Sequence, residues 1–253
     1  MAETRILGTF YGVGIGPGDA ELLTVQARRV LSSVPVIFVP KAKITDEGLA
    51  LQILLKALQD GGASPALKSG LRELVFPMSK DPAVLKPAWD GARAAVLDEL
   101  RAGRDCAFIT LGDTAIYSTY MNLVAGLRQD EPGLRMVTVP GISSYSQAAA
   151  ALNLSLVEKA EKMAILPCLS EVEGLRPDLE RFDTVVLMKV GRRFADLREL
   201  LRGMGLLPYS HLALKLGGPG SVLGSDLDSV DASLVSYMSL VIVRKPLKAG
   251  YDE

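Results

Sequence analysis

Short apolar runs alternate with amphipathic segments along the first half of the chain. The runs predict strands at 8–14, 34–40, 72–77, 106–114 and 134–141. Between them, apolar residues that recur every three or four positions predict helices at 21–33, 47–60, 82–102, 117–128 and 143–152. Strands that alternate with helices in this way pair in parallel and are covered by the helices.

A polar, charged stretch around 154–161 interrupts the pattern, which then starts again. The second half predicts strands at 162–167, 183–191, 211–218 and 237–245, and a helix at 194–202. The sequence therefore predicts an α/β protein made of two α/β domains, residues 1–156 and 157–253.

Composition excludes several classes of protein. Of the 253 residues, 49% are hydrophobic and 23% are charged, a balance typical of folded globular domains. The net charge of −1 argues against a nucleic-acid partner, which usually requires a basic excess. No apolar run approaches the ~20 residues that span a bilayer, and the first ten residues do not resemble a signal peptide. We expect a cytoplasmic protein with no membrane partner, in which Cys106 and Cys168 are buried, reduced thiols.

The stretch YGVGIGPGDAELLT, residues 11–24, places four glycines between a predicted strand and a predicted helix. A dinucleotide-binding turn needs glycine at its first, third and sixth positions, but counting from Gly12 puts Pro17 at the sixth. Asp19 would also place a negative charge where a pyrophosphate should lie. The turn therefore does not bind a nicotinamide cofactor. Asp19 is well placed to cap a helix that begins at Ala20 or Glu21, so a structural turn with a helix cap stays open as the alternative.

Two further motifs give the chain a family resemblance. These are TLGDTAIYSTY at 110–120 and VTVPGISSYSQAAAALNLSL at 137–156. Together with the glycine turn they resemble the tetrapyrrole methylase family, the class III S-adenosylmethionine-dependent methyltransferases, in order from residue 10 to 244. The finer segments IFVPKAK, FPMSKDP, VVLMKVGRR and YMSLVIVR resemble the branch that methylates carbon 20 of precorrin-2 in cobalamin biosynthesis. Another methyltransferase of the corrin pathway is the alternative within the fold.

The resemblance implies that S-adenosylmethionine is the methyl donor and lies in a cleft between the two domains. Asp113 would bind its ammonium group through a charge-assisted hydrogen bond. The family turn is commonly Gly-Asp-Pro, whereas this chain has Thr114 in place of the proline. The positions that match the family's cofactor contacts are Pro17, Leu111, Gly112, Asp113, Thr114, Ile116, Ser143, Ser144, Met188 and Gly217.

The resemblance also implies a small-molecule tetrapyrrole substrate with eight carboxylate arms, and a homodimer. The glycine turn would face the macrocycle, and lysines at strand or loop ends would meet its carboxylates. After methyl transfer the substrate carbon loses a proton, for which Asp19 is the first candidate acceptor and Tyr117 the second. The residues expected on the substrate side are Gly14, Gly16, Lys41, Lys80 and Lys189.

Each of these residues also has a structural interpretation. Met188 lies in an apolar run that is typical of a core strand, and Tyr117 and Tyr120 are spaced like packed aromatics on one helix face. His211, the single histidine, is expected to have a structural or surface role, and no residues have the spacing of a metal site. Three rival functions are a relative that acts on an RNA ribose, one that acts on a modified histidine, and a binding module without turnover; the net charge of −1 argues against the first.

Overall fold

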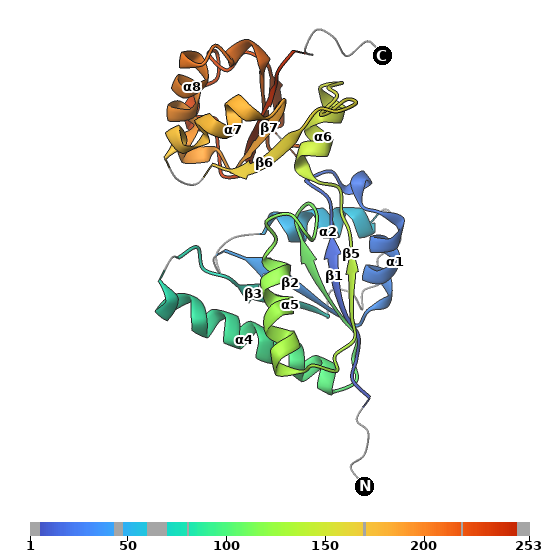
Figure 1. The fold of residues 1–253 in the computed structure, drawn as a ribbon. Coiled ribbons are helices and arrows are strands. Elements are labelled where there is room, and N and C mark those ends of the chain that lie inside the picture. The colour runs from blue at the N-terminus through green and yellow to red at the C-terminus, as the bar shows by residue number, and fades with distance from the viewer. Residues whose placement is uncertain are drawn as a thin grey trace. The chain divides into compact units, whose positions relative to one another are not determined.

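A computed structural model describes residues 6–42, 48–59, 70–79, 81–168, 171–218 and 220–246. The chain divides into two compact units, Met1–Ser144 and Tyr145–Glu253, each built around its own sheet (Figure 1). In the described ranges, no helix has both the length and the apolar character needed to cross a membrane.

The first unit contains a five-stranded parallel sheet with the strand order β3-β2-β4-β1-β5. Its strands are β1 (Phe10–Gly14), β2 (Val36–Lys41), β3 (Leu71–Val75), β4 (Cys106–Thr110) and β5 (Met136–Val139). Its helices are α1 (Val25–Ser33), α2 (Leu49–Gln59), α4 (Pro82–Arg101) and α5 (Thr119–Asp130). The five predicted strands and the helices predicted at 47–60, 82–102 and 117–128 are therefore confirmed, whereas the helix predicted at 21–33 differs.

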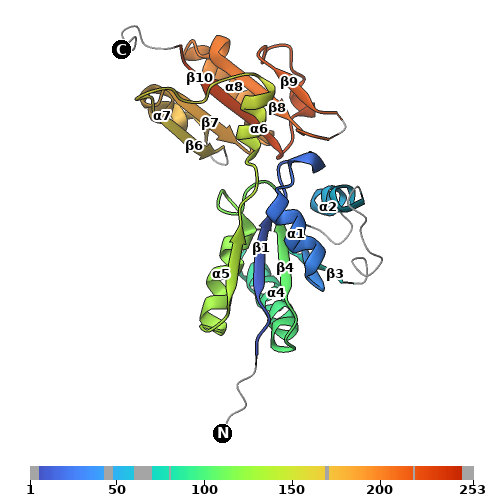
Figure 2. The same cartoon turned by 90° about the vertical axis from the view of Figure 1, so that its right-hand side faces the viewer.

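Helices cover both faces of this sheet, α1 and α2 on one side and α4 and α5 on the other (Figure 2). Alternate residues of β4 show how the two cores form: Ala107 and Ile109 pack with α1 and α2, whereas Cys106 and Phe108 pack with α4 and α5. A strand that is buried on both faces reads as a continuous apolar run, which is why the sequence predicts it clearly.

Helix starts in this unit follow ordinary capping chemistry. The Asp19 carboxylate accepts a hydrogen bond from the Glu21 amide at 3.0 Å, which confirms its predicted capping role, but the element it caps is the short 3-10 helix Ala20–Leu22. The Thr24 hydroxyl caps α1 by accepting from the Ala27 amide at 3.1 Å. The segment predicted as one helix is therefore two elements, each with its own cap.

The second unit has a mixed sheet with the strand order β6-β7-β10-β8-β9. Its strands are β6 (Met163–Pro167), β7 (Thr184–Met188), β8 (Ser210–Leu214), β9 (Val222–Gly224) and β10 (Ser239–Arg244). Its helices are α6 (Ser144–Ala151), which begins at the last residue of the first unit, α7 (Arg176–Arg181) and α8 (Phe194–Gly203). Strands β6 and β7 pair in parallel, whereas β10 runs antiparallel to both β7 and β8. The expectation of parallel pairing thus fails in this half.

Helix α6 packs against the second sheet, whereas the predicted first domain, residues 1–156, includes it. Its Ala148 and Ala149 are buried against Val186, Leu240 and Ile242. Helices α7 and α8 cover the opposite face of the same sheet. The division between the units therefore falls at Ser144, before α6, rather than in the polar stretch after it.

That polar stretch is fixed to the second unit by a buried ion pair. Glu161 and Arg244 approach to 2.7 Å, and only 4% and 9% of their side chains are exposed. Arg244 also donates to the Ser155 carbonyl at 2.9 Å. Hydrogen bonding from Arg244 holds the pKa of Glu161 below its usual value.

Candidate functional site

The carboxyl ends of β1 and β4 lie side by side in the first sheet, and the chain leaves them in opposite directions. After β1 it continues into α1 on one face, and after β4 it continues into α5 on the other. Ligands of parallel α/β sheets bind at such a switch point, outside the carboxyl ends of the strands. The glycine turn and the TLGDT turn, the two motifs that carry the resemblance, both lie here.

Two backbone hydrogen bonds join these turns. The Gly112 amide donates to the Gly16 carbonyl at 2.7 Å, and the Gly16 amide donates to the Gly112 carbonyl at 3.3 Å. Both residues have positive φ, +78° for Gly16 and +73° for Gly112, a conformation that favours glycine. The glycines at these two positions are therefore needed to form the joined turns.

Gly14 and Gly141 bring a third turn, the one after β5, against the first two. A Cβ on Gly14 would lie 2.6 Å from the Gly141 nitrogen and 2.8 Å from the Gly112 carbonyl oxygen. A Cβ on Gly141 would overlap the same Gly112 oxygen. The bare backbone at position 14 is thus covered by other backbone of this unit, which gives this glycine a structural reason of its own.

Asp113 links the turn after β4 to the turn after β5. Its Oδ1 accepts a hydrogen bond from the Ala115 amide at 2.8 Å, and its Oδ2 accepts one from the Gly141 amide at 3.1 Å. Each carboxylate oxygen keeps a further lone pair that can accept another donor. The residue is partly buried.

The rest of this turn leads into α5. Thr114 is buried, whereas Leu111 and Ile116 are partly exposed. Tyr117 has a left-handed backbone (φ +50°) and 45% exposure, and burial of its ring raises its pKa. Tyr117 and Tyr120 do not share a helix face as expected, because Ser118 caps α5 and only Tyr120 lies within it.

Ser143 and Ser144 lie where the turn after β5 enters α6. Both are partly buried, and Ser144 is the first residue of the helix. The first turn of a helix has amide groups without intrahelical acceptors, so hydroxyls at this position lie beside donors that suit an anionic group. Pro17, in the glycine turn, is buried.

In the second unit, the sequence-predicted residues follow the carboxyl ends of β7 and β8. Met188 ends β7 and is partly buried against the core that contains α6. The Lys189 ammonium lies 5.2 Å from the centre of the Tyr237 ring, and its backbone is left-handed (φ +61°). Gly217, after β8, also has positive φ (+73°) and is exposed.

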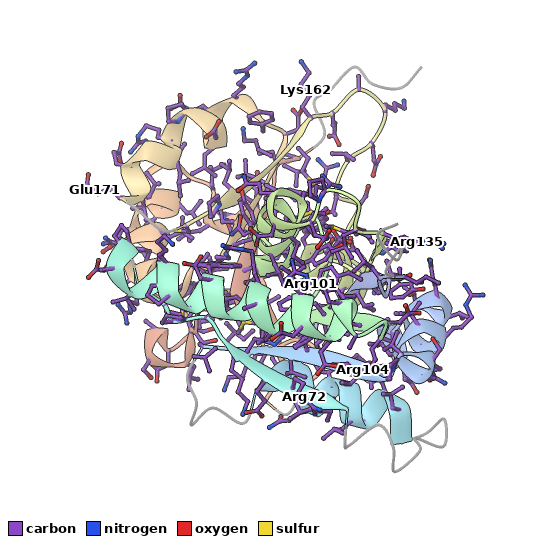
Figure 3. All side chains as sticks on the ribbon, turned by 90° about the horizontal axis from the view of Figure 1, so that it is seen from below. Arg72, Arg101, Arg104, Arg135, Lys162 and Glu171 are labelled. Carbon is purple, nitrogen blue, oxygen red and sulfur yellow. The ribbon has the colours of Figure 1, made fainter. Side chains whose placement is uncertain are left out.

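Of the other two lysines expected on the substrate side, only Lys41 lies within the described residues. Lys41 forms a 2.6 Å ion pair with Glu73, and only 8% of its side chain is exposed. Lys80 lies outside the described residues. Arg101 and Arg104, labelled in Figure 3, lie near the amino ends of the strands and pair with Glu131 and Glu99.

The residues expected to be structural behave as such. Cys106 and Cys168 are buried free thiols, as predicted. His211 lies within β8, its Nδ1 is 2.8 Å from the Ser225 hydroxyl, and burial lowers its pKa. In the described ranges, no group of three or more His, Cys, Asp or Glu side chains could hold a metal ion.

Comparison with known proteins gives consistent matches over most of the chain. The family model described as "Tetrapyrrole (Corrin/Porphyrin) Methylases" matches residues 9–209. The "Cobalt-precorrin-2 C(20)-methyltransferase" of Salmonella typhimurium is 31% identical over 94% of this chain and 97% of its own length. The "Probable cobalt-precorrin-2 C(20)-methyltransferase" of Methanocaldococcus jannaschii is 40% identical over 73% of this chain and 74% of its own.

A solved structure adds a ligand to the comparison. Uroporphyrin-III C-methyltransferase from Thermus thermophilus, complexed with S-adenosylhomocysteine, aligns with a TM-score of 0.61 and 25% identity. The alignment covers 94% of this chain and 97% of that one.

Proposed function

The chain belongs to the tetrapyrrole (corrin/porphyrin) methylase family, and from this we propose that it transfers the methyl group of S-adenosylmethionine to carbon 20 of precorrin-2 in cobalamin biosynthesis. The substrate is precorrin-2 or its cobalt complex. The observation that carries this proposal is the similarity to the Salmonella C(20)-methyltransferase, which extends over 94% of this chain and 97% of the relative.

The residues at the carboxyl edge of the first sheet suit the amino-acid end of the cofactor. The Asp113 carboxylate can complement an ammonium group, and Ser143 and Ser144 at the start of α6 can complement a carboxylate. The proposed cofactor residues are Pro17, Leu111, Gly112, Asp113, Thr114, Ile116, Ser143 and Ser144, with Met188 and Gly217 for the adenosyl part.

Methyl transfer from S-adenosylmethionine is a single displacement at a sulfonium methyl, so the protein needs no covalent intermediate. Its task is to hold the substrate carbon close to that methyl group and to exclude water, and positioning of this kind is worth ~7–11 kcal/mol. On the substrate side we place the glycine turn with Gly14 and Gly16, and the lysines Lys41, Lys80 and Lys189. Lys41 must leave Glu73, or act together with it, to meet a substrate carboxylate.

The methylated carbon must then lose its proton to a base. We propose Asp19, whose Oδ1 is held by the Glu21 amide in the glycine turn. Tyr117 is the second candidate, but burial raises its pKa, which makes its phenolate a scarce base near neutral pH.

Incubation with isotopically labelled S-adenosylmethionine tests the proposed reaction. We expect one labelled methyl group on precorrin-2, located on carbon 20 by NMR. Comparing the rates of methyl transfer to the metal-free and the cobalt-loaded substrate then identifies which form the enzyme uses. Label at another carbon would indicate a different methyltransferase of the corrin pathway. Binding of the substrate without any transfer would indicate a binding module.

A cytoplasmic homodimer completes the proposal, on the basis of the family resemblance. Light scattering should give twice the 27.0 kDa mass of one chain. A mass of one chain at working concentration would contradict the dimer but not the reaction.

A further inference from the structure

Two segments of the second unit that carry the sequence resemblance meet at one edge of its sheet. VVLMKVGRR contains the end of β7 and the turn after it, and YMSLVIVR leads into β10. The two strands pair antiparallel, with Leu240 opposite Met188, so the residues after β7 lie beside the residues before β10. This arrangement places the Lys189 ammonium 5.2 Å from the centre of the Tyr237 ring.

The backbone around Lys189 is held by the segment before β10. The Val190 amide donates a hydrogen bond to the Ser239 carbonyl at 3.3 Å. A Cβ on Gly191 would lie 3.1 Å from the backbone of residues 236–237, so the two segments are in close contact. Lys189 itself has a left-handed φ of +61°, which is uncommon for a lysine. Packing against the segment before β10 therefore fixes the position and the conformation of this turn.

The segment before β10 is ordered by its own hydrogen bonds. The Ser236 amide donates to the Ser239 hydroxyl at 3.1 Å, and the Ser239 amide donates back to the Ser236 carbonyl at 3.1 Å. The Met238 amide donates to the Ser236 hydroxyl at 3.3 Å. These bonds hold the segment in a conformation that leaves the side chain of Tyr237 44% exposed. The ring is thus kept at the surface beside Lys189, and it does not fill the core.

The edge that carries this pair is also the edge proposed for the adenosyl part of the cofactor. Met188 ends β7 directly before Lys189, and Gly217 follows β8, the strand on the other side of β10. Both β7 and β8 run antiparallel to β10, so their carboxyl ends lie at the same edge of the sheet. A substrate that receives the methyl group must lie against the cofactor. The Lys189 ammonium is therefore at an edge where it can bind one carboxylate arm of that substrate.

We propose that Tyr237 is a positioning residue for the substrate, and that its ring holds the Lys189 ammonium at this edge, where the ammonium binds a carboxylate arm of the tetrapyrrole. The attraction between a cation and an aromatic ring holds the lysine side chain. A long side chain that is held in place before the substrate arrives loses less conformational entropy on binding. The inference rests on the proposed function, since the ligand is precorrin-2 or its cobalt complex, and it adds Tyr237 to the residues on the substrate side.

Three variants separate the ring from the charge. Tyr237→Leu removes the ring, and Tyr237→Phe keeps the ring and removes only the hydroxyl. Lys189→Met removes the charge but keeps an unbranched side chain. The matched controls are Tyr209→Leu and Lys162→Met, because Tyr209 and Lys162 directly precede β8 and β6 at the opposite edge of the same sheet. Tyr209 is also similar to Tyr237 in its exposure, at 38%.

Steady-state kinetics with precorrin-2 as the varied substrate, at saturating S-adenosylmethionine, gives the first measurement. We expect KM to rise about 2- to 5-fold in Tyr237→Leu and about 10-fold in Lys189→Met, while kcat changes less than about 2-fold. Tyr237→Phe and both controls should stay near wild type. In the double variant, KM should equal that of Lys189→Met alone, because the ring acts through the ammonium.

Several outcomes of the kinetics contradict the proposal. Unchanged KM in Tyr237→Leu overturns it directly. A further rise in KM when Tyr237→Leu is added to Lys189→Met also overturns it, because the ring would then act without the ammonium. An equal rise in Tyr209→Leu would show a general effect of removing a surface ring. A changed mass of the assembly in light scattering, with KM unchanged, would show that Tyr237 contacts a second copy of the chain instead.

NMR of the ligand-free protein gives the second measurement, which does not depend on the proposed function. The methylene protons next to the Lys189 ammonium lie near the Tyr237 ring, so the ring current should shift them upfield. The shift should persist in Tyr237→Phe and vanish in Tyr237→Leu, and its absence from wild type overturns the proposal. Failure of the wild-type protein to methylate precorrin-2 would refute the proposed function and the substrate role with it, while the NMR shift would still decide whether Tyr237 holds Lys189.

Discussion

The ring of Tyr120 occupies the space that a side chain at Gly12 would need. A Cβ built on Gly12 would overlap three carbon atoms of that ring. Tyr120 is fully buried, and its hydroxyl is 2.8 Å from the Thr138 hydroxyl on β5. The first position of the turn motif therefore requires glycine because a buried side chain of α5 fills the space beside it.

Gly12→Ala should consequently destabilise the protein by ~2–3 kcal/mol, because Tyr120 has to move and lose its contact with Thr138. Urea unfolding measures this change. The control is Gly91→Ala within α4, where a Cβ would meet nothing within 4 Å and should stabilise the helix by ~0.5–1 kcal/mol. Tyr120→Leu removes the ring, so Gly12→Ala should lower the free energy of unfolding less in that background than in wild type. If the two changes in the free energy of unfolding simply add, the steric explanation is contradicted.

Asp19→Asn should lower the methylation rate while leaving the affinity for S-adenosylhomocysteine nearly unchanged. Asparagine caps helices about as well as aspartate, so this change removes the proposed base but keeps the cap on the 3-10 turn. Single-turnover kinetics and calorimetry measure the two quantities. Asp19→Ala is the companion variant, in which the cap is lost as well. Full activity in Asp19→Asn would leave Asp19 with its structural role alone.

Low pH should destabilise the fold of the second unit, because Glu161 becomes protonated. Because Arg244 lowers the pKa of Glu161 in the folded state, the pair stabilises the fold fully above the ordinary value of 4.5. That stabilisation is lost as the pH falls through the lowered folded-state pKa and Glu161 becomes protonated. At neutral pH, Glu161→Gln should cost about 3 kcal/mol, since it leaves Arg244 buried without a charged partner.

Unfolding of wild type and Glu161→Gln as a function of pH checks this prediction. The difference in the free energy of unfolding should shrink steadily below pH 4.5. The control is Glu199→Gln, because the ion pair of Glu199 with Arg202 is exposed and should matter little at any pH. A difference that is independent of pH would show that the charge of Glu161 is not what stabilises the fold.

Both cysteines should be inert in the folded protein at pH 8. Burial raises the pKa of Cys106 to about 12 and also raises that of Cys168, so only a trace of reactive thiolate is present. Mass spectrometry after iodoacetamide treatment should show no labelled thiol in buffer and two in urea. Rapid labelling of Cys106 in buffer would mean that the core between β4 and α4 opens easily.

The strands of the first unit could be predicted because β1, β2 and β4 are buried on both faces and therefore appear as unbroken apolar runs. An apolar run does not indicate the direction of its strand, so the antiparallel pairing of β10 cannot be predicted from it. Helix α7 and strand β9 were missed because they are short, and an element of three to six residues has too few positions to establish a period.

The site could be predicted in part. An acid directly before a helical pattern is enough to predict the cap at Asp19, and the hydroxyl of Thr24 before α1 is the same kind of signal. The partners of Gly12 and Asp113 could not be predicted, because Tyr120 and Gly141 are distant in sequence and meet them only through the tertiary fold. Local patterns identify turns and caps, but not which turns touch.

The position of β4 in the first sheet has a consequence during synthesis of the chain. Strand β1 pairs with β4 and β5 but not with β2, so its first neighbour is made only when β4 emerges. The hydrogen bond from Thr9 to Asp105 spans 96 residues, which a ribosome adding ~5–20 residues per second needs on the order of 5–20 s to produce. For that interval the apolar β1 is exposed without a partner strand, a window in which a chaperone can bind it or two nascent chains can aggregate.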